Sequence, residues 1–177
     1  VSNDAPLEAV AAVRRGAPAA RLVVDANQSW SVSQLQKLAP ALAELQVDLL
    51  EQPVTASDDA ELQNLELPVP VCADEAADTA ADLPRLRDRY DFVNIKLDKT
   101  GGLTAALDFA HAARAAGLRL MVGCMISSSL AMAPAMVLAQ LCEVVDLDGP
   151  LLQAEDWPNG IVYRNGTMSL PSPAFWG

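Results

Sequence analysis

The sequence predicts an α/β fold in which about six βα units form the C-terminal portion of a TIM-like (β/α) barrel. Short apolar runs alternate with longer segments of helical periodicity, which is typical of parallel strands joined by crossover helices. Polar residues end five of these runs, namely Asp25, Glu51, Asp74, Lys96 and Asp146. The first four are separated by 26, 23 and 22 residues, about one βα unit each, and no glycine-rich phosphate-binding motif occurs. This spacing favours a barrel over an open doubly wound sheet.

The predicted strands and helices alternate along most of the chain. Strands are expected at residues 21–25, 47–51, 69–74, 92–96, 118–123 and 144–148. Helices are expected at residues 33–44, 58–65, 79–88, 103–115 and 130–141. Gly117 follows the fourth helix at the place where a C-cap requires a positive φ.

The predicted organisation has two parts. Residues 1–156 are expected to form the partial barrel, and residues 157–177 a hairpin and tail that return to a capping domain absent from this chain. Within the tail, the pair Asn165-Gly166 between short apolar runs predicts a hairpin with a type I′ turn. Because a closed barrel needs eight strands, we expect two further strands and a lid domain upstream in a longer enzyme.

Composition excludes several classes of protein. Of the 177 residues, 51% are hydrophobic, which supports a folded core, and the net charge of −11 argues against nucleic-acid or anionic-membrane partners. The three cysteines form no closely spaced pair, so a disulfide framework or a zinc site is not expected. With no secretory signal at the start and no membrane-length apolar run, the sequence predicts a cytoplasmic location.

Three carboxylates end consecutive predicted strands. Asp25, Glu51 and Asp74 would be neighbours around the mouth of a barrel, where three bare carboxylates repel one another unless a cation neutralises them. All-oxygen ligation selects a hard ion such as Mg²⁺, with one ion expected per site. The alternative is that these residues are helix N-caps and solvated loop charges.

Two lysines follow the next strand. Lys96 beside a bound cation would have a lowered pKa and could abstract a proton, although it could also be a counter-ion to the carboxylates or an exposed loop charge. Lys99 could be a second base, but it lies beyond the strand end, which favours a structural or pocket-wall role.

Several motifs in order resemble the enolase superfamily and its muconate-lactonizing-enzyme subgroup. They are residues 25–27 before Trp30, residues 49–53, residues 72–75 and residues 94–102. Residues 123–126 and 146–150 resemble the dipeptide epimerases within that subgroup. The similarity runs from about Val13 to about Leu152, and the motifs are specific as an ordered set.

The resemblance implies an isomerase that inverts an α-carbon by 1,1-proton transfer through a metal-stabilised enolate. Asp25, Glu51 and Asp74 would bind Mg²⁺, and Lys96 would be one acid/base. The second base would come from a Lys-x-Lys strand that this sequence lacks. The implied substrate is a dipeptide, with L-Ala-D/L-Glu as the leading candidate, in the recycling of bacterial cell-wall peptides.

Further site residues are expected around these positions. Asp146 and Asp148 match an Asp-x-Asp that holds the dipeptide ammonium group, although a solvated acidic turn is the alternative. Met125 and Ile126 would contact substrate. The segment differs here from relatives of the family that carry Glu just after the corresponding Met-Ile or Met-Leu pair. Asn27 and Gln52 flank the metal ligands and could orient their carboxylates through hydrogen bonds. Glu75 could orient Lys96 by ion pairing or could instead cap the following helix.

Other polar and sulfur-containing residues receive structural interpretations. Arg85, Arg87 and Arg89 are expected to form a solvated helix end, and His111 to lie on a helix surface. Cys72 and Cys124 are expected to be small core residues. Trp30 could either wall the pocket or pack at the rim.

Two alternative functions remain open. One is another superfamily enzyme, such as an o-succinylbenzoate synthase, an N-acylamino-acid racemase or a cycloisomerase. The other is a truncated, non-catalytic metal-binding barrel, in which the two open edges of the sheet would pair with another segment. A second copy of the chain could be such a partner, which would give a homo-oligomer.

Overall fold

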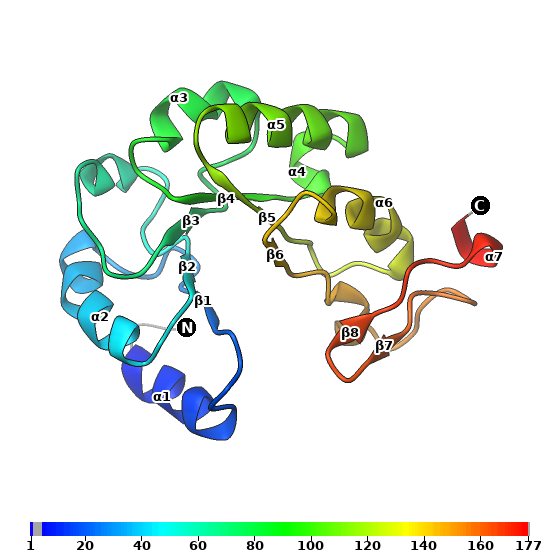
Figure 1. Ribbon diagram of the computed structural model, residues 1–177, viewed down its shortest axis with the longest axis horizontal. Coiled ribbons are helices and arrows are strands. Elements are labelled where there is room, and N and C mark those ends of the chain that lie inside the picture. Colours follow the sequence, from blue (N-terminus) through cyan, green and yellow to red (C-terminus); the bar gives the residue numbers. More distant parts are fainter. Residues whose placement is uncertain (2–4, 177) are drawn as a thin grey trace. The chain divides into compact units, whose positions relative to one another are not determined.

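Six strands, hydrogen-bonded in sequence order, form the sheet of the computed structural model, which describes residue 1 and residues 5–176. They are β1 (Val23–Asp25), β2 (Leu49–Glu51), β3 (Val71–Ala73), β4 (Phe92–Ile95), β5 (Arg119–Val122) and β6 (Val144–Val145) (Figure 1). The pairs β1–β2, β2–β3, β3–β4 and β5–β6 are parallel. Each strand lies within a predicted segment, so the predicted α/β class is confirmed.

The helices separate these strands. The α-helices are α1 (Pro6–Gly16), α2 (Val32–Glu44), α3 (Leu83–Leu86), α4 (Leu97–Thr100), α5 (Leu103–Ala115), α6 (Ser129–Ala139) and α7 (Pro173–Trp176). Short 3-10 helices are η1 (Asp59–Leu62), η2 (Ala80–Asp82) and η3 (Gly149–Leu152), and a separate hairpin consists of β7 (Tyr163–Arg164) and β8 (Thr167–Met168). None of the helices in the described ranges is long and apolar enough to cross a membrane.

The chain divides into two compact units. Unit 1 comprises Val1–Val93 and Ala116–Leu118, and unit 2 comprises Asn94–Ala115 and Arg119–Gly177. Unit 1 therefore holds β1, β2 and β3, whereas unit 2 holds β5, β6 and the hairpin. The predicted division after residue 156 stays a prediction.

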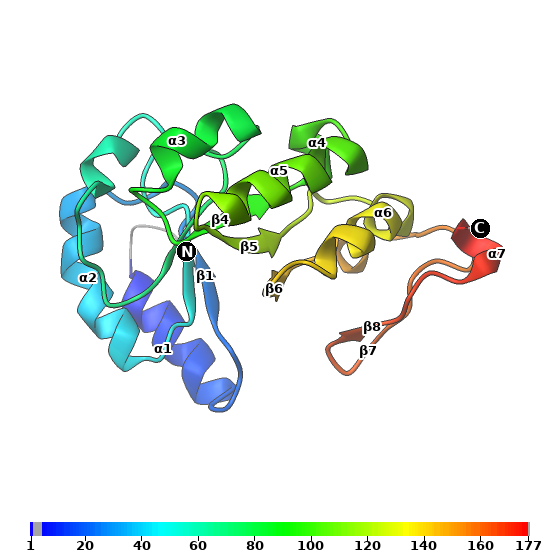
Figure 2. The ribbon, with the colours of Figure 1, turned by 45° about the horizontal axis from the view of Figure 1, so that its top comes forward.

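In unit 1, helix α2 covers the strands with one apolar face. Its start is fixed by a capping box, in which the Gln34 backbone N–H donates to the Ser31 hydroxyl and the Ser31 N–H donates to the Gln34 side chain. The helix then buries Leu35, Ala39 and Leu42, which recur at helical spacing. Helix α1 lies beside α2 (Figures 1 and 2).

Helix α1 was not among the predicted elements, although local signals mark both of its ends. Pro6 begins the helix, and two arginines lie in its last turn, as the helix dipole favours. One of them, Arg14, donates through Nε to the carbonyl of Leu45 at 2.9 Å and through Nη2 to that of Gln46 at 2.7 Å. These bonds attach α1 to the end of α2.

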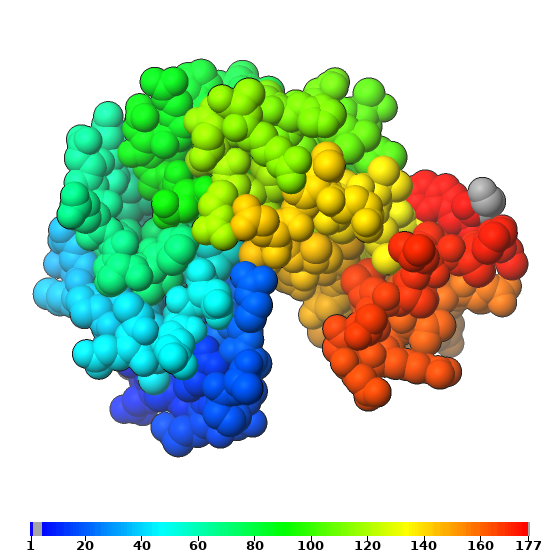
Figure 3. All heavy atoms as spheres, viewed as in Figure 1, coloured from blue at the N-terminus to red at the C-terminus, as the bar shows by residue number. Residues whose placement is uncertain are grey.

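In unit 2, helix α5 contacts both β5 and α6 and buries four residues spaced along one face, namely Ala106, Phe109, Ala110 and Ala113. Its bounds match the prediction, His111 is exposed as expected, and Gly117 adopts the predicted positive φ, at +89°. In the hairpin, Asn165 and Gly166 both have positive φ, which confirms the type I′ turn. The segment that contains the hairpin, orange to red in Figure 3, contributes a broad part of the surface of unit 2.

Two predicted helices were wrong in extent. The segment 58–65 contains only the 3-10 helix η1, and the segment 79–88 contains η2 followed by the single turn α3. In the same region, buried Asp59 at the start of η1 pairs with Arg85 and Arg89, so these two arginines do not form the expected solvated helix end. A local pattern cannot report a pairing between segments 26 and 30 residues apart.

The core of unit 1 gives a direct test of the fold. Leu35 in α2 is 0% exposed, so Leu35→Ala should lower the free energy of unfolding by about 2–5 kcal/mol through lost burial and a residual cavity. Lys37→Ala, on the exposed face of the same helix, is the matched control and should change stability little. Urea unfolding measures both, and equal losses for the two variants would contradict the assigned helix face.

Candidate functional site

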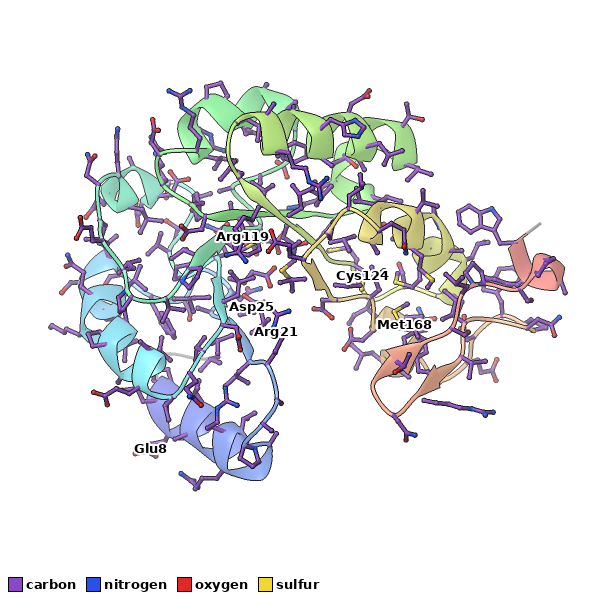
Figure 4. All side chains as sticks on the ribbon, viewed as in Figure 1. Glu8, Arg21, Asp25, Arg119, Cys124 and Met168 are labelled. Atoms are coloured by element: carbon purple, nitrogen blue, oxygen red, sulfur yellow. The ribbon has the colours of Figure 1, made fainter. Side chains whose placement is uncertain are left out.

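The three predicted metal ligands lie at the carboxyl ends of neighbouring strands in unit 1. Asp25 ends β1 and is paired in register with Glu51, which ends β2 (Figure 4 labels Asp25). Asp74 follows β3 directly. The register is fixed by backbone bonds, since Ala26 N–H donates to the Glu51 carbonyl at 3.1 Å. Adjacent strands are only about 4.8 Å apart, so the three residues occupy neighbouring positions along this edge of the sheet.

The donor set fits a hard divalent cation. Glu51 and Asp74 are each 5% exposed, whereas Asp25 is exposed, so two of the three carboxylates are largely removed from water. Their oxygens are the ligands that Mg²⁺ prefers. Within residue 1 and residues 5–176, no group of three His, Cys, Asp or Glu side chains is already gathered into a metal-binding arrangement. The fit therefore rests on donor chemistry and strand register.

Gln52 and Asn27 contact the segments that carry these carboxylates. The Gln52 side-chain oxygen accepts from the backbone N–H of Asp74 at 2.8 Å and of Ala76 at 3.1 Å. Asn27 acts through its main chain, because its N–H donates to Asp25 Oδ1 at 2.7 Å. Both contacts are consistent with the predicted orienting roles.

For Glu75 and for Trp30, the structure argues against one of the two interpretations that the sequence left open. The helix after Glu75 is capped by Thr79 and Asp82, so the expected capping by Glu75 is wrong. Glu75 is half-buried, and its Oε2 is a buried atom with no hydrogen-bond partner in the described part of the chain. Trp30 is 3% exposed, which favours packing over a pocket wall.

The remaining site residues belong to unit 2. Lys96 directly follows β4, is half-buried, and accepts hydrogen bonds at its carbonyl from Lys99 N–H at 3.0 Å and Thr100 N–H at 3.1 Å. Lys99 is half-buried within α4. Asp146 follows β6, and its side chain and that of Asp148 are exposed.

The thiol of Cys124 lies within the electrostatic influence of three charged residues of unit 2. Burial raises the pKa of its thiol, the Gly149 N–H hydrogen bond lowers it, and the charges of Asp146 and Asp148 raise it, with Lys96 opposing them. The side chain follows β5 and is half-buried, so the expectation of a core cysteine holds for Cys72 but is wrong for Cys124 (labelled in Figure 4). The charges of Lys96 and of both aspartates therefore all act on the Cys124 thiol.

The loop after Cys124 presents apolar side chains beside these charges. Met125 is 52% exposed and Ile126 is 70% exposed, so both are available to a ligand. The loop lies against the turn at Gly149, where a Cβ atom would come within 2.8 Å of the Met125 carbonyl oxygen. Glycine is therefore required for this close approach, which holds the loop next to Asp148.

Two cavities differ in their relation to these residues. A cavity of about 370 Å³ in unit 2 is lined partly by Asp146, Asp148 and Tyr163. A larger one, about 710 Å³ in unit 1, is lined by residues that precede β3 and β4, such as Glu66 and Arg87. The larger cavity touches none of the predicted site residues and lies at the opposite strand ends, so we assign it no role.

A contact that the sequence did not predict holds the far end of the loop that follows Cys124. Asp156 Oδ1 accepts from the Ser129 N–H at 2.9 Å, and its Oδ2 accepts from the Ser129 hydroxyl. Ile161 N–H donates to that hydroxyl at 2.8 Å, and Trp157 Nε1 donates to the Ser128 hydroxyl at 3.2 Å. Because Asp156 and Ser129 are 27 residues apart, no local pattern signals this contact.

Residues 2–174 match the model of the family described as "Enolase C-terminal domain-like". An N-acetyl-D-glutamate racemase from Pseudoalteromonas sp is 48% identical over 166 residues, which cover 94% of this chain and 53% of that protein. An L-Ala-D/L-Glu epimerase from Escherichia coli (strain K12) is 46% identical over 170 residues, which cover 96% and 53%. The chain thus spans about half the length of the curated relatives it matches.

Solved structures agree with this similarity. A crystal structure of an enolase family member from Agrobacterium tumefaciens with homology to dipeptide epimerases superimposes with a TM-score of 0.95 and 46% identity. The match covers 99% of this chain and 54% of that one, and that structure holds sodium and L-Ala-L-Glu with an ordered loop.

The contact between Asp156 and Ser129 predicts that the thermal stability of the protein depends on pH. Burial alone would raise the pKa of Asp156, but hydrogen bonds from Ser129 and Trp157 lower it below its ordinary value of 3.8. A carboxylate whose pKa is lowered on folding stabilises the fold above that ordinary value, and this contribution is lost as the pH falls through the folded pKa. The melting temperature of Asp156→Asn should therefore lie below that of the unaltered protein near neutral pH, with a gap that shrinks below about pH 4.

Melting curves between neutral pH and about pH 3 measure this gap. Glu155→Gln, at the exposed neighbouring position, is the matched control and should melt like the unaltered protein throughout. A gap for Asp156→Asn that stays constant across the range would contradict the role of the carboxylate.

Proposed function

Because the chain belongs to the enolase C-terminal domain-like family, we propose that it forms the C-terminal portion of an Mg²⁺-dependent dipeptide epimerase. The observation that carries the proposal is the placement of Asp25, Glu51 and Asp74 at the carboxyl ends of three neighbouring strands. Lys96 follows the next strand along the chain. The reaction proposed is inversion of an α-carbon beside a carboxylate, with L-Ala-D/L-Glu as the leading substrate.

The three carboxylates would hold one Mg²⁺ ion. Bound there, the ion would neutralise charge on the substrate carboxylate and so make the adjacent α-proton more acidic. Burial of Glu51 and Asp74 supports this role, because two carboxylates withheld from water gain strongly from a cation. Asp25, which is exposed, would complete the set from the first strand.

Lys96 would move the proton at its Nζ atom. Its half-buried position after β4 supports this role, because partial removal from water favours the neutral amine over the ammonium form. Neutral Lys96 would take the α-proton on one face of the carbon, or its ammonium would return a proton there. Inversion also needs a second acid/base on the opposite face, and we propose that a strand outside this chain supplies it.

Asp146 and Asp148 would bind the free ammonium group of the dipeptide. Their charges both act on the Cys124 thiol, as does that of Lys96, which supports a common location in unit 2. Two carboxylates provide charge-assisted acceptors for an ammonium group. Met125 and Ile126, exposed on the adjoining loop, would contact the apolar parts of the substrate.

An N-acylamino-acid racemase is the second candidate, favoured by the 48% identity to the N-acetyl-D-glutamate racemase. An N-acetylated amino acid carries no ammonium group, so such a substrate would have no use for a pair of carboxylates. The pair Asp146 and Asp148 therefore favours the dipeptide. We also propose a cytoplasmic location, because Cys72, Cys124 and Cys142 form no disulfide with one another.

Proton exchange tests the role of Lys96. With Mg²⁺ in D₂O, proton NMR should show loss of the Glu α-proton signal of L-Ala-L-Glu or L-Ala-D-Glu in the presence of the full-length protein that contains this chain. Lys96→Ala should slow exchange from at least one isomer by about 10²–10⁴-fold, because a positioned proton acceptor is lost. Lys37→Ala, on the exposed face of α2, should leave the rate unchanged. Unaltered exchange from both isomers in Lys96→Ala would exclude this lysine as an acid/base.

Substrate affinity tests the ammonium site. Asp146→Asn combined with Asp148→Asn should raise KM for L-Ala-L-Glu by about tenfold or more, because each hydrogen bond to a charged group contributes about 1.5–3 kcal/mol. The same change should not raise KM for N-acetyl-glutamate, which lacks the ammonium group. Asp108→Asn, an exposed carboxylate on α5, is the control. Turnover of N-acetyl-glutamate in preference to the dipeptide would favour the racemase instead.

A further inference from the structure

A buried amide lies directly next to one proposed metal ligand and holds the backbone of another. Gln52 is 0% exposed and follows Glu51 in the chain. Its oxygen accepts from Asp74 N–H and Ala76 N–H, while its Nε2 donates to the Val54 carbonyl at 2.9 Å and to the Tyr90 hydroxyl at 3.1 Å. The amide uses both donors and both acceptor sites, and its backbone partners fix which end is oxygen.

The backbone at Gln52 is itself unusual. Its φ of +31° lies in a region that non-glycine residues adopt only at a cost, so the surrounding contacts must maintain it. Gln52 N–H donates to the Cys72 carbonyl at 2.9 Å, and its carbonyl accepts from Gln28 N–H at 2.7 Å. This conformation turns the side chain into the interior immediately after Glu51.

Tyr90 connects this amide to a buried carboxylate. Its hydroxyl accepts from Gln52 and donates to Asp59 Oδ2 at 3.4 Å, and the ring is 5% exposed. Burial and the charge of Asp59 raise the pKa of Tyr90 well above its ordinary value, so the hydroxyl stays protonated. The donor to Asp59 is therefore present at every working pH.

Two arginines balance Asp59, which is 2% exposed. Arg85 Nη1 donates to its Oδ2 at 2.9 Å, and Arg89 Nη1 donates to its Oδ1. Arg85 also donates through Nη2 to the Ala76 carbonyl. The turn after β3 is thus held from two sides, by Gln52 at its N–H groups and by Arg85 at a carbonyl.

We propose that Gln52, Tyr90 and Asp59 form a positioning network that holds Glu51 and Asp74 in the geometry required to bind the metal ion. This inference rests on the proposed function, in which both carboxylates are ligands. The network joins the segments after β2 and β3 to the segment before β4, all within unit 1. Its members touch the ligand-bearing backbone rather than substrate, so they act through Glu51 and Asp74.

Removing one hydroxyl tests the network. Tyr90→Phe keeps the buried ring but deletes the link between Gln52 and Asp59. In the full-length protein that contains this chain, calorimetric titration with Mg²⁺ should give a Kd about tenfold higher for this variant, the lower end of the loss typical for groups that orient metal ligands. Circular dichroism below the melting temperature should show an unchanged fold.

The second tyrosine provides a matched control. Tyr163→Phe removes a hydroxyl that donates to the Leu147 carbonyl at 2.6 Å in unit 2, and its Kd for Mg²⁺ should equal that of the unaltered protein. If Tyr90→Phe is folded and binds Mg²⁺ as tightly as Tyr163→Phe, the positioning role is wrong while the proposed metal site stands. If the unaltered protein does not bind Mg²⁺, the proposed metal site fails and this inference fails with it.

A second variant guards against instability of the first. Asp59→Asn keeps the size of the side chain but weakens its pairing with Arg85 and Arg89. It should also raise the Kd for Mg²⁺. The variant that combines Tyr90→Phe with Asp59→Asn should lose less binding free energy than the sum of the two single losses, because both changes break one network. Strictly additive losses would overturn the proposed connection.

Discussion

Parallel pairing of β1, β2 and β3 is the constraint on which the proposed chemistry depends. The register places Asp25 opposite Glu51, and Asp74 directly follows the third strand. Carboxylates on neighbouring strand ends are costly unless something offsets their charge, and a cation does so with the ligand type it prefers. The sheet thus both creates the electrostatic cost and defines the metal that could relieve it.

Each unit contributes a different part of the proposed reaction. Unit 1 holds the carboxylates and the buried amide that orients their backbone, whereas unit 2 holds Lys96 and the two aspartates around Cys124. In both units, a single residue that hydrogen-bonds to a loop, or that lets a loop pack closely, holds that loop in place. Gln52 does so after β2, Ser129 at the start of α6, and Gly149 against the Met125 carbonyl.

Most of the elements that depend on a local pattern could be predicted from the sequence. Apolar runs located all six strands, Ala-rich periodicity gave the bounds of α5, and Asn165-Gly166 gave the hairpin turn. The positions of Asp25, Glu51 and Asp74 at strand ends followed from the same rhythm. Helix α1 was missed even though Pro6 at its start and arginines at its end are local signals.

What the sequence did not give depends on pairing between distant segments. Arg85 and Arg89 were expected to be solvated, but both pair with buried Asp59. The Asp156 contact with Ser129 and the Tyr90 contact with Gln52 likewise join residues 27 and 38 apart. Such contacts follow from the packing of the strands, which no local window contains.

The location of a bound metal tests the account most directly. Crystals of the full-length protein grown with Mn²⁺, an anomalous scatterer that takes the same oxygen ligands, would show where the cation binds. The account predicts one strong anomalous peak within coordination distance of carboxylate oxygens from Asp25, Glu51 and Asp74. A peak located only at Asp146 and Asp148, or none at the three strand ends, would contradict it.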